Sequence, residues 1–193
     1  VIVFVSGSNL IVALELATGN YRVLLDFGAD DGPDTSDVTF SPFMIAYSRR
    51  GDIWAAGYQL NEAGLIEVDA TSIVNLTNTP DTGELACSFS RDGTYLSYSR
   101  LLDLWDIVVL DLLTMEETVA LEGLRGRREA AWSPDGSQFC IHDVEQLPSG
   151  KKIIDIFRIT NWDDWPNRTV IQVTADRNQD ELHPDWRPPP WGN

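Results

Sequence analysis

The chain has 193 residues, of which 43% are hydrophobic, enough for one ordinary domain with a core or for a small repeat array. Thirty acidic against 14 basic residues give a net charge of −16, which disfavours binding to nucleic-acid phosphates and to anionic membrane surfaces. The sequence contains no run of about 18 or more apolar residues, so it predicts no membrane-spanning helix.

The first residues, VIVFVSGSNL, lack a Met and a basic segment and become polar too early for a signal peptide. We therefore expect a processed or trimmed N-terminus. Cys87 and Cys140 do not have the spacing of metal ligands. They could pair with each other, but two buried thiols are the favoured interpretation.

An aromatic strand followed by a polar turn occurs four times along the chain. The first copy, VTFSPFMIAYS (38–48), has a turn two residues shorter than the next two copies. Those copies, CSFSRDGTYLSYS (87–99) and AAWSPDGSQFCIH (130–142), align at an offset of 43 and share an Asp-Gly turn. The fourth copy, PDWRPPPW (184–191), keeps only the aromatic residue. The repeat positions are Phe40, Phe89, Trp132 and Trp186 for the aromatic residue, and Asp92, Gly93, Asp135 and Gly136 for the turn.

Each aromatic strand is followed by three more short strands, and helical periodicity is nearly absent. A polar residue and a branched apolar residue open the third strand, at Asn9-Leu10, Asp52-Ile53, Asp106-Ile107 and Asp155-Ile156. At Asp106 and Asp155 we expect the side chain to accept backbone N–H bonds in the preceding turn. The fourth strands are predicted at 21–25, 73–77, 118–121 and 170–174. The units therefore begin near residues 37, 84, 127 and 181.

The spacing of the aromatic positions predicts how the repeats close. Successive aromatic positions lie 49, 43 and 54 residues apart. Counting from Trp186 to the C-terminus and then on from residue 1 to Phe40 gives 47 residues, a spacing similar to the others. The segment IVFVS near the N-terminus matches a second strand, whereas the C-terminus stops just after a first strand. We expect the two ends to supply different strands of one blade and so to close the ring.

The segments AAWSPDGSQF and LTNTPDTGELACSFSRDGTYLSYS resemble the repeat of TolB-like β-propellers, which are related to WD-type repeats. The resemblance covers nearly the whole chain, in three clear copies and one split copy. It implies an all-β fold, namely a single domain (1–193) that forms a small four-bladed propeller of four-stranded antiparallel blades. TolB-like propellers usually contain more blades, so the alternative is a larger ring shared by two chains. The resemblance also implies export, and hence an extracytoplasmic location with the signal peptide removed, and protein partners.

Catalytic and metal-binding motifs are not found in the sequence. His142 and His183 belong to no metal-ligand pair, and no nucleophile elbow is present, so we predict no enzyme activity. The loop DFGADDGPDTSD (26–37) offers aspartate oxygens to Ca²⁺, through Asp30, Asp31, Asp34 and Asp37. Its spacing does not fit a calcium-binding loop, and loop aspartates commonly form turns. We therefore expect no cofactor.

Two aromatic segments are candidate assembly contacts. The loop NWDDWPN (161–167) carries Trp162 and Trp165, which could pack on their own chain, contact another protein or stack on a sugar. The tail RPPPWGN (187–193) places Trp191 after a stiff proline run, Pro188, Pro189 and Pro190. Trp191 could fold back on its own blade or dock on an adjacent copy, and a head-to-tail contact of that kind produces rings or open filaments and tubes.

These features favour a non-catalytic, self-associating structural or protein-interaction module. The expected partners are other copies of the chain or another protein, and neither nucleic acid nor a membrane span is expected. The alternatives are a ligand- or glycan-binding propeller and a TolB-like periplasmic accessory protein.

Overall fold

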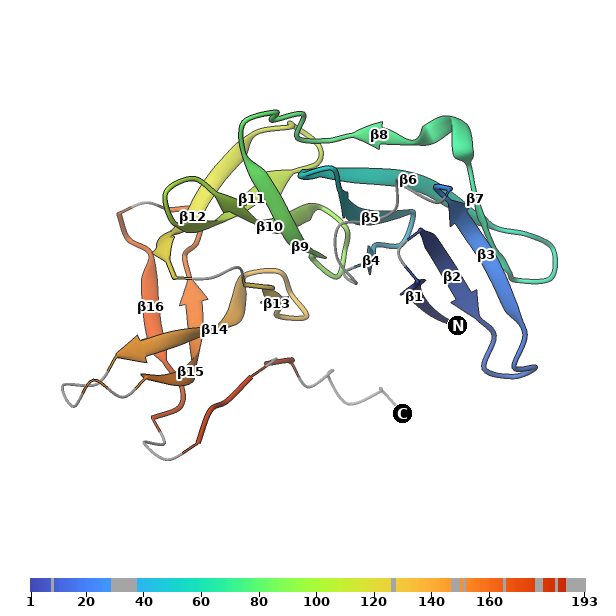
Figure 1. Ribbon diagram of the computed structural model, residues 1–193. Coiled ribbons are helices and arrows are strands. Elements are labelled where there is room, and N and C mark those ends of the chain that lie inside the picture. The colour runs from blue at the N-terminus through green and yellow to red at the C-terminus, as the bar shows by residue number, and fades with distance from the viewer. Residues whose placement is uncertain are drawn as a thin grey trace. The chain divides into compact units, whose positions relative to one another are not determined.

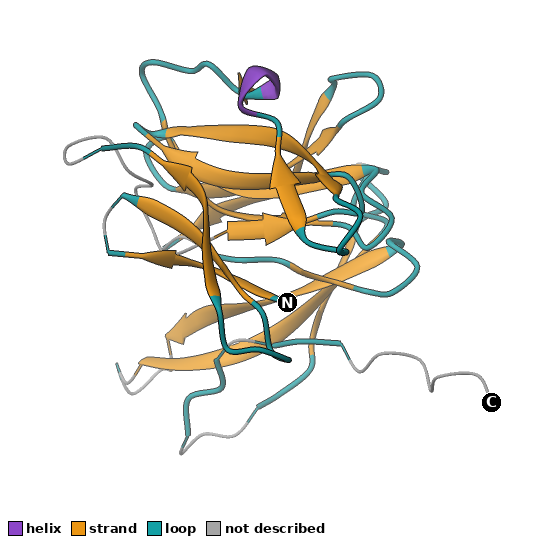
Figure 2. Cartoon of the chain, turned by 90° about the vertical axis from the view of Figure 1, so that its right-hand side faces the viewer, coloured by secondary structure: helices purple, strands orange, loops and turns teal. Residues whose placement is uncertain are grey.

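In a computed structural model, the described residues are 1–7, 9–28, 38–125, 128–146, 150, 152–164, 166–175, 179–182 and 184–186. They fold almost entirely into β-strands, and the one helical element among them is the 3₁₀ turn η1 (Ala70–Ser72) (Figure 2). Within these ranges, no helix has the length and hydrophobicity that crossing a membrane requires. The chain forms two compact units, residues 1–87 and residues 88–193.

The first unit contains two antiparallel sheets (Figure 1). The N-terminal sheet has the order β1-β2-β3, formed by β1 (Ile2–Ser6), β2 (Leu10–Leu14) and β3 (Tyr21–Asp26). The next sheet has five strands, β4 (Val38–Phe40), β5 (Met44–Arg49), β6 (Asp52–Leu60), β7 (Ile66–Val68) and β8 (Val74–Asn75). In this sheet β6 pairs with β5, β7 and β8.

The other two sheets are four-stranded and antiparallel. One has the order β12-β11-β10-β9, formed by β9 (Gly83–Phe89), β10 (Tyr95–Leu101), β11 (Trp105–Asp111) and β12 (Glu117–Leu124). The other has the order β13-β14-β15-β16, formed by β13 (Ala131–Trp132), β14 (Gln138–Gln146), β15 (Lys152–Thr160) and β16 (Thr169–Gln172). The all-β expectation and the four antiparallel sheets are therefore confirmed.

The strand counts differ from the expected uniform blade of four strands. The N-terminal sheet has three strands and the next sheet has five. Among the described residues, β1 pairs only with β2, whereas the second strand of each other sheet has a first strand beside it, namely β4, β9 or β13. The expected closure of the ring by both termini is not among these strand pairings.

Each unit has its own hydrophobic core. In the first unit, Ile11, Ile45 and Tyr47 form a fully buried cluster with aromatic side chains around it. In the second unit the core is centred on Trp132, Phe139 and Ile141, with residues of β11, β12 and β15 packed against them. The middle strand β10 is buried on both faces, because Leu96 and Tyr98 alternate with the buried serines Ser97 and Ser99.

The polar turn of the repeat is held by one serine and one aspartate. In the third copy, Ser133 Oγ accepts a hydrogen bond from the Gln138 N–H at 3.2 Å and donates to Asp135 at 2.6 Å. Asp135 also accepts from Ser137, through the backbone N–H at 3.2 Å and the hydroxyl at 2.9 Å. Gly136 has φ +70°, a backbone conformation that favours glycine.

The second copy builds the same turn. Ser90 Oγ accepts from the Tyr95 N–H at 2.9 Å and donates to Asp92 at 2.7 Å, and Asp92 accepts from the Thr94 N–H at 3.0 Å. These hydrogen bonds lower the pKa of Asp92, the Thr94 N–H contributing most. At Asp135 the Ser133 hydroxyl is the main cause of a lowered pKa. Both carboxylates are therefore structural acceptors in their charged form.

We predict that the double substitution Asp92→Ala, Asp135→Ala lowers the melting temperature at pH 7 and that its effect fades at acid pH. Because both folded-state pKa values lie below the unfolded value of about 4, the stabilisation is complete above that pH and is lost as the pH falls through the folded pKa values. Thermal melts at about pH 7, 4 and 2.5 measure the difference.

Asp81→Ala together with Asp103→Ala is the matched control, because both aspartates are exposed and the two substitutions remove the same two charges from an acidic chain. Its melting temperature should stay close to that of the unmodified protein. A deficit in the double variant that is equally large at all three pH values would refute the role of the charged carboxylates.

Candidate functional site

Two tryptophans at the repeat position make the same hydrogen bond. The indole Nε1 of Trp132 donates to the Ser88 carbonyl at 3.1 Å, and that of Trp186 donates to the Ala131 carbonyl at 2.7 Å. Each accepting residue lies directly before the aromatic residue of the preceding copy, Phe89 or Trp132. Trp186 therefore contacts the sheet of β13 to β16 in the same way as Trp132 contacts the sheet of β9 to β12. By this correspondence, residues 184–186 occupy the first-strand position of a further repeat.

A cleft of about 430 Å³ lies where these repeat positions meet in the second unit. Residues from the second, third and fourth copies of the repeat line this cleft: Ser88, Phe89, Ala131, Trp132, Pro184 and Asp185. Arg91, Glu129 and His142 add charged or titratable groups. The cleft can therefore offer a cation, two carboxylates and an imidazole to a polar ligand. Among the described residues, no three His, Cys, Asp or Glu side chains are grouped so that they could hold a metal ion.

The sequence motifs do not predict this cleft. His142 belongs to no metal-ligand pair, and Arg91, Glu129 and Asp185 belong to no catalytic or binding motif. Their position in the repeat could have indicated these residues. Arg91, Glu129 and Asp185 each lie within three residues of the aromatic residue of a repeat copy, whereas His142 does not. Side chains at such positions converge where the copies meet.

The aspartates that open the third strands have different partners from those predicted. Asp155 is fully buried and accepts from Gln172 Nε2 at 2.9 Å and Thr174 Oγ1 at 3.2 Å. Asp106 accepts from the Gly123 N–H at 3.0 Å, in the following strand β12. The described donors to both aspartates therefore lie in or just after the fourth strand, and part of the turn before Asp155 (147–149 and 151) lies outside the described residues. The third strand pairs with the fourth in antiparallel fashion, so an aspartate in the first half of the third strand lies beside the end of the fourth strand.

Asp52 follows the same arrangement in the first unit. It accepts from Asn75 Nδ2 at 2.7 Å and from the Thr79 N–H at 2.8 Å. Asn75 and Gln172 occupy equivalent fourth-strand positions. The aspartates thus hold the fourth strand to the third in three of the four sheets, which is a structural role.

The candidate contact Trp162 is covered by its own chain. Only 6% of its surface is exposed, and its ring meets Tyr95 and Trp132 edge-on, with centroids 4.9 and 5.5 Å away. For this residue the structure shows self-packing, one of the alternatives left open by the sequence. Other candidates lie outside the described residues: Trp165, Pro188, Pro189, Pro190, Trp191, Asp30, Asp31, Asp34, Asp37 and His183. Both cysteines are free thiols.

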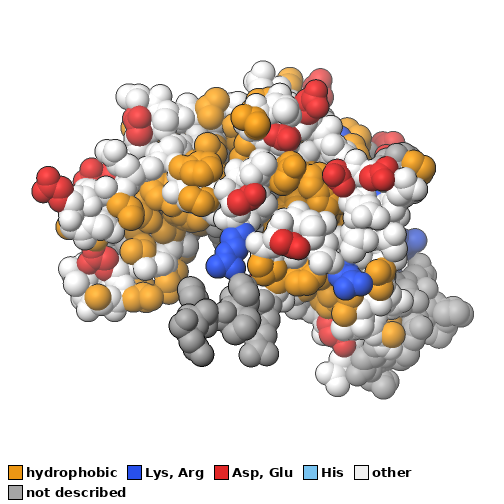
Figure 3. Space-filling view, turned by 180° about the vertical axis from the view of Figure 1, so that it is seen from behind, with side chains coloured by type: hydrophobic (Ala, Val, Ile, Leu, Met, Phe, Trp, Pro, Cys, Tyr) orange, Lys and Arg blue, Asp and Glu red, His pale blue; other side chains and the backbone are white. Residues whose placement is uncertain are grey.

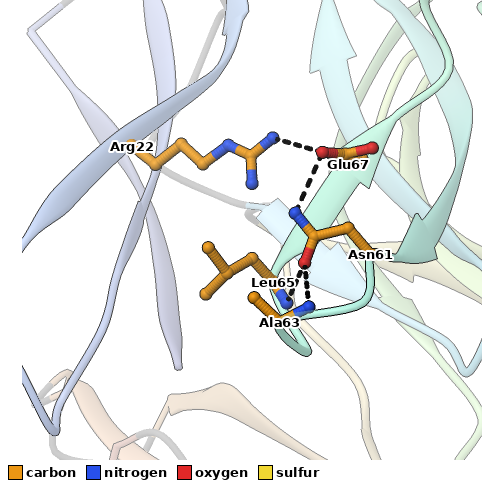
Figure 4. A network of polar contacts seen from close by, with 5 residues as sticks. All are labelled: Arg22, Asn61, Ala63, Leu65 and Glu67. Carbon is orange, nitrogen blue, oxygen red and sulfur yellow. Dashed lines mark hydrogen bonds and ion pairs between the residues drawn. The ribbon is translucent and has the colours of Figure 1, made fainter.

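A polar network organises one edge of the first unit (Figure 4). Arg22 on β3 forms an ion pair with Glu67 on β7, with 3.2 Å between Nη2 and Oε1. Asn61 donates to the same carboxylate oxygen at 3.0 Å and accepts from the Ala63 and Leu65 N–H groups, both at 3.0 Å. The Asn61 hydrogen bond, followed by Arg22, lowers the pKa of Glu67. Because the pair is exposed it stabilises little, but it fixes the β6–β7 connection against β3.

Solved structures with a similar fold include TolB from Acinetobacter baumannii. That match has a TM-score of 0.63 and 17% sequence identity, and it covers 95% of this chain and 43% of TolB. A Bacteroides uniformis protein provisionally named a 6-phosphogluconolactonase matches with a TM-score of 0.50 and 16% identity, over 89% of this chain and 48% of that protein. The fold is therefore that of TolB-like β-propellers, and the chain spans less than half the length of either protein. No family model and no curated protein matches the sequence.

We predict that Trp132→Phe lowers the free energy of unfolding by about 1–3 kcal/mol, because it leaves the Ser88 carbonyl and the Ser97 hydroxyl without the indole donor. Urea unfolding measures the loss. Trp162→Phe is the matched control, since it makes the same change in a buried tryptophan whose contacts are ring packing. Equal losses in the two variants would contradict a specific contribution from the hydrogen bonds.

Proposed function

We propose that this chain is a non-catalytic, extracytoplasmic propeller module that associates with further copies of itself as a structural or protein-interaction component. The observation that carries the proposal is the open edge of β1, which pairs only with β2 among the described residues. An open strand edge presents unpaired N–H and C=O groups, and adding a strand from another segment satisfies them.

The repeat pattern supplies a candidate for the missing strand. By its position in its sheet, β1 corresponds to a second strand, and none of the described residues forms a first strand beside it. Residues 184–186 behave like a first strand that has no sheet to join. Trp186 makes the hydrogen bond typical of the first-strand aromatic residue, yet these three residues belong to no sheet. We propose that this segment pairs with β1. Pairing within one chain closes the ring through both termini, and pairing with the next copy makes a head-to-tail assembly.

The charge of the chain sets a condition on this association. Two copies with a net charge of −16 each repel one another, and Figure 3 shows acidic side chains scattered among hydrophobic ones. Salt screens such repulsion, since the screening length falls from about 10 Å at 0.1 M to about 3 Å at 1 M ionic strength. Contacts made by strand pairing and apolar side chains should therefore strengthen as salt is added.

A second candidate function, binding of a small polar or sugar-like ligand, is supported by the cleft in the second unit. Its volume of about 430 Å³ lies in the range of small-ligand sites, and Arg91, Glu129 and Asp185 line it together. A ligand of this site would raise the melting temperature by mass action. The extracytoplasmic location is supported by the resemblance to TolB-like repeats, and the sequence motifs offer no support for catalysis.

We predict that the unmodified protein forms species larger than 21.6 kDa, and that their fraction grows with protein concentration and between about 0.1 and 1 M NaCl. Size-exclusion chromatography with light scattering measures this. A monomer at every concentration and salt level would rule out self-association.

Cysteine cross-linking then locates the contact. In a Cys87→Ala, Cys140→Ala background, a cysteine at Val3 or Val5 of β1 is combined with one at Pro184 or Asp185. Neighbouring strands bring such pairs within disulfide reach. Linked dimers support head-to-tail assembly, whereas a disulfide within one chain supports closure of its own ring. Leu113→Cys with Pro184→Cys is the control, because Leu113 is exposed in the turn between β11 and β12 and takes part in neither proposed contact.

A further inference from the structure

A small pocket lies in the first unit, between the β2–β3 hairpin and the β6–β7 connection. Ala13, Tyr21, Leu65 and Ile66 give it an apolar wall, and Glu15 and Asn20 lie at its polar side. Its volume of about 260 Å³ is below the range of about 300–1,000 Å³ that is typical of small-molecule sites. A pocket of this size suits one or two side chains of a protein partner.

The pocket is held in shape before any partner arrives. Glu67 links Arg22 on β3 to Asn61, and Asn61 in turn holds the backbone of Leu65 through a 3.0 Å hydrogen bond (Figure 4). The β6–β7 side of the pocket is thereby fixed against the β3 side. A preformed pocket loses less conformational entropy on binding, so a short segment can bind there with useful affinity.

An exposed tyrosine stands at this pocket. Tyr21 is 70% exposed, and its ring meets Phe4 edge-on with centroids 6.3 Å apart. Val23, two residues further along the same strand, is 52% exposed. Tyr21 is the one aromatic side chain that lines the pocket. Exposed aromatic rings bind proline-rich segments in the polyproline II conformation, because the rigid proline rings pack on the aromatic face at little entropic cost.

The sequence contains one segment with the matching chemistry. Residues 187–193 read RPPPWGN, with an arginine, three consecutive prolines and a tryptophan. The prolines suit the exposed face of Tyr21, and Trp191 suits an apolar pocket of side-chain size. The pocket is lined by both Glu15 and Arg22, so Arg187 can pair with Glu15 only on the side away from Arg22. Tryptophan is also the residue type most enriched among the energetic hot spots of protein interfaces.

We propose that this pocket binds residues 187–193 of a second copy, with Trp191 as the anchor. The inference rests on the proposed self-association and names the surface that receives the neighbour. Strand pairing at β1 and this contact would then act in the same head-to-tail junction, and two linked contacts hold more tightly than either alone.

The test uses the full-length Trp191→Ala variant as receptor, so that its own tail lacks the anchor. An acetylated, fluorescein-labelled RPPPWGN peptide is titrated with this receptor, and fluorescence anisotropy measures binding. We expect saturable binding that weakens about tenfold or more when Tyr21→Ala is added to the receptor, or when the peptide carries Trp191→Ala. Glu15→Lys should weaken binding less, and Leu113→Ala, which alters an 88% exposed leucine of the second unit, should leave it unchanged.

Thermal melts of each receptor variant verify that it is folded, and light scattering of the unmodified protein separates the two proposals. If larger species form but the peptide does not bind and Tyr21→Ala leaves them intact, the pocket assignment is wrong and self-association stands. If the peptide binds in a Tyr21-dependent way while the unmodified protein stays monomeric, the pocket assignment stands and self-association is wrong.

Discussion

The hydrogen bond from the indole of one repeat to the backbone of the preceding repeat is the constraint on which the second unit depends. Trp132 donates both to the Ser88 carbonyl and to the hydroxyl of the buried Ser97. Ser97 itself donates to the same carbonyl at 3.1 Å, so three groups that would be costly to bury alone satisfy one another. This explains why a serine lies in the middle of the core strand β10 and why the repeat keeps a large aromatic residue at this position.

The four repeat copies differ in whether their aromatic residue can make this hydrogen bond. Phe40 and Phe89 occupy the aromatic position without an N–H to donate, and Phe40 packs instead against Tyr58, whose hydroxyl donates to the Ser41 carbonyl at 2.8 Å. Trp186 repeats the Trp132 hydrogen bond but belongs to no sheet, whereas the sheet of β1 to β3 has no first strand within the part of the chain that the structure describes. The proposed function joins these two incomplete parts, and the binding proposed at the Tyr21 pocket would add a second contact to the same junction.

The repeat and its strands could be predicted because they depend on local chemistry. The Ser-Asp-Gly turns are determined by residues within a few positions of one another, and the alternation in strands such as β10 follows directly from burial. Contacts between segments distant in sequence could not be predicted in this way. The partners of Asp155 lie about 20 residues further along the chain, and the burial of Trp162 depends on Tyr95 and Trp132. The Arg22–Glu67 network likewise joins β3 to β7 across 45 residues.

Hydrogen–deuterium exchange of the β1 amides shows whether a further strand pairs with the outer edge of β1. Alternate N–H groups of Ile2–Ser6 face away from β2, and they are protected only if another strand pairs with that edge. The account predicts that these outward amides exchange as slowly as those facing β2, and that Trp186→Ala accelerates the outward set alone. Outward amides that already exchange in the unmodified protein as fast as those of an open strand edge would contradict it.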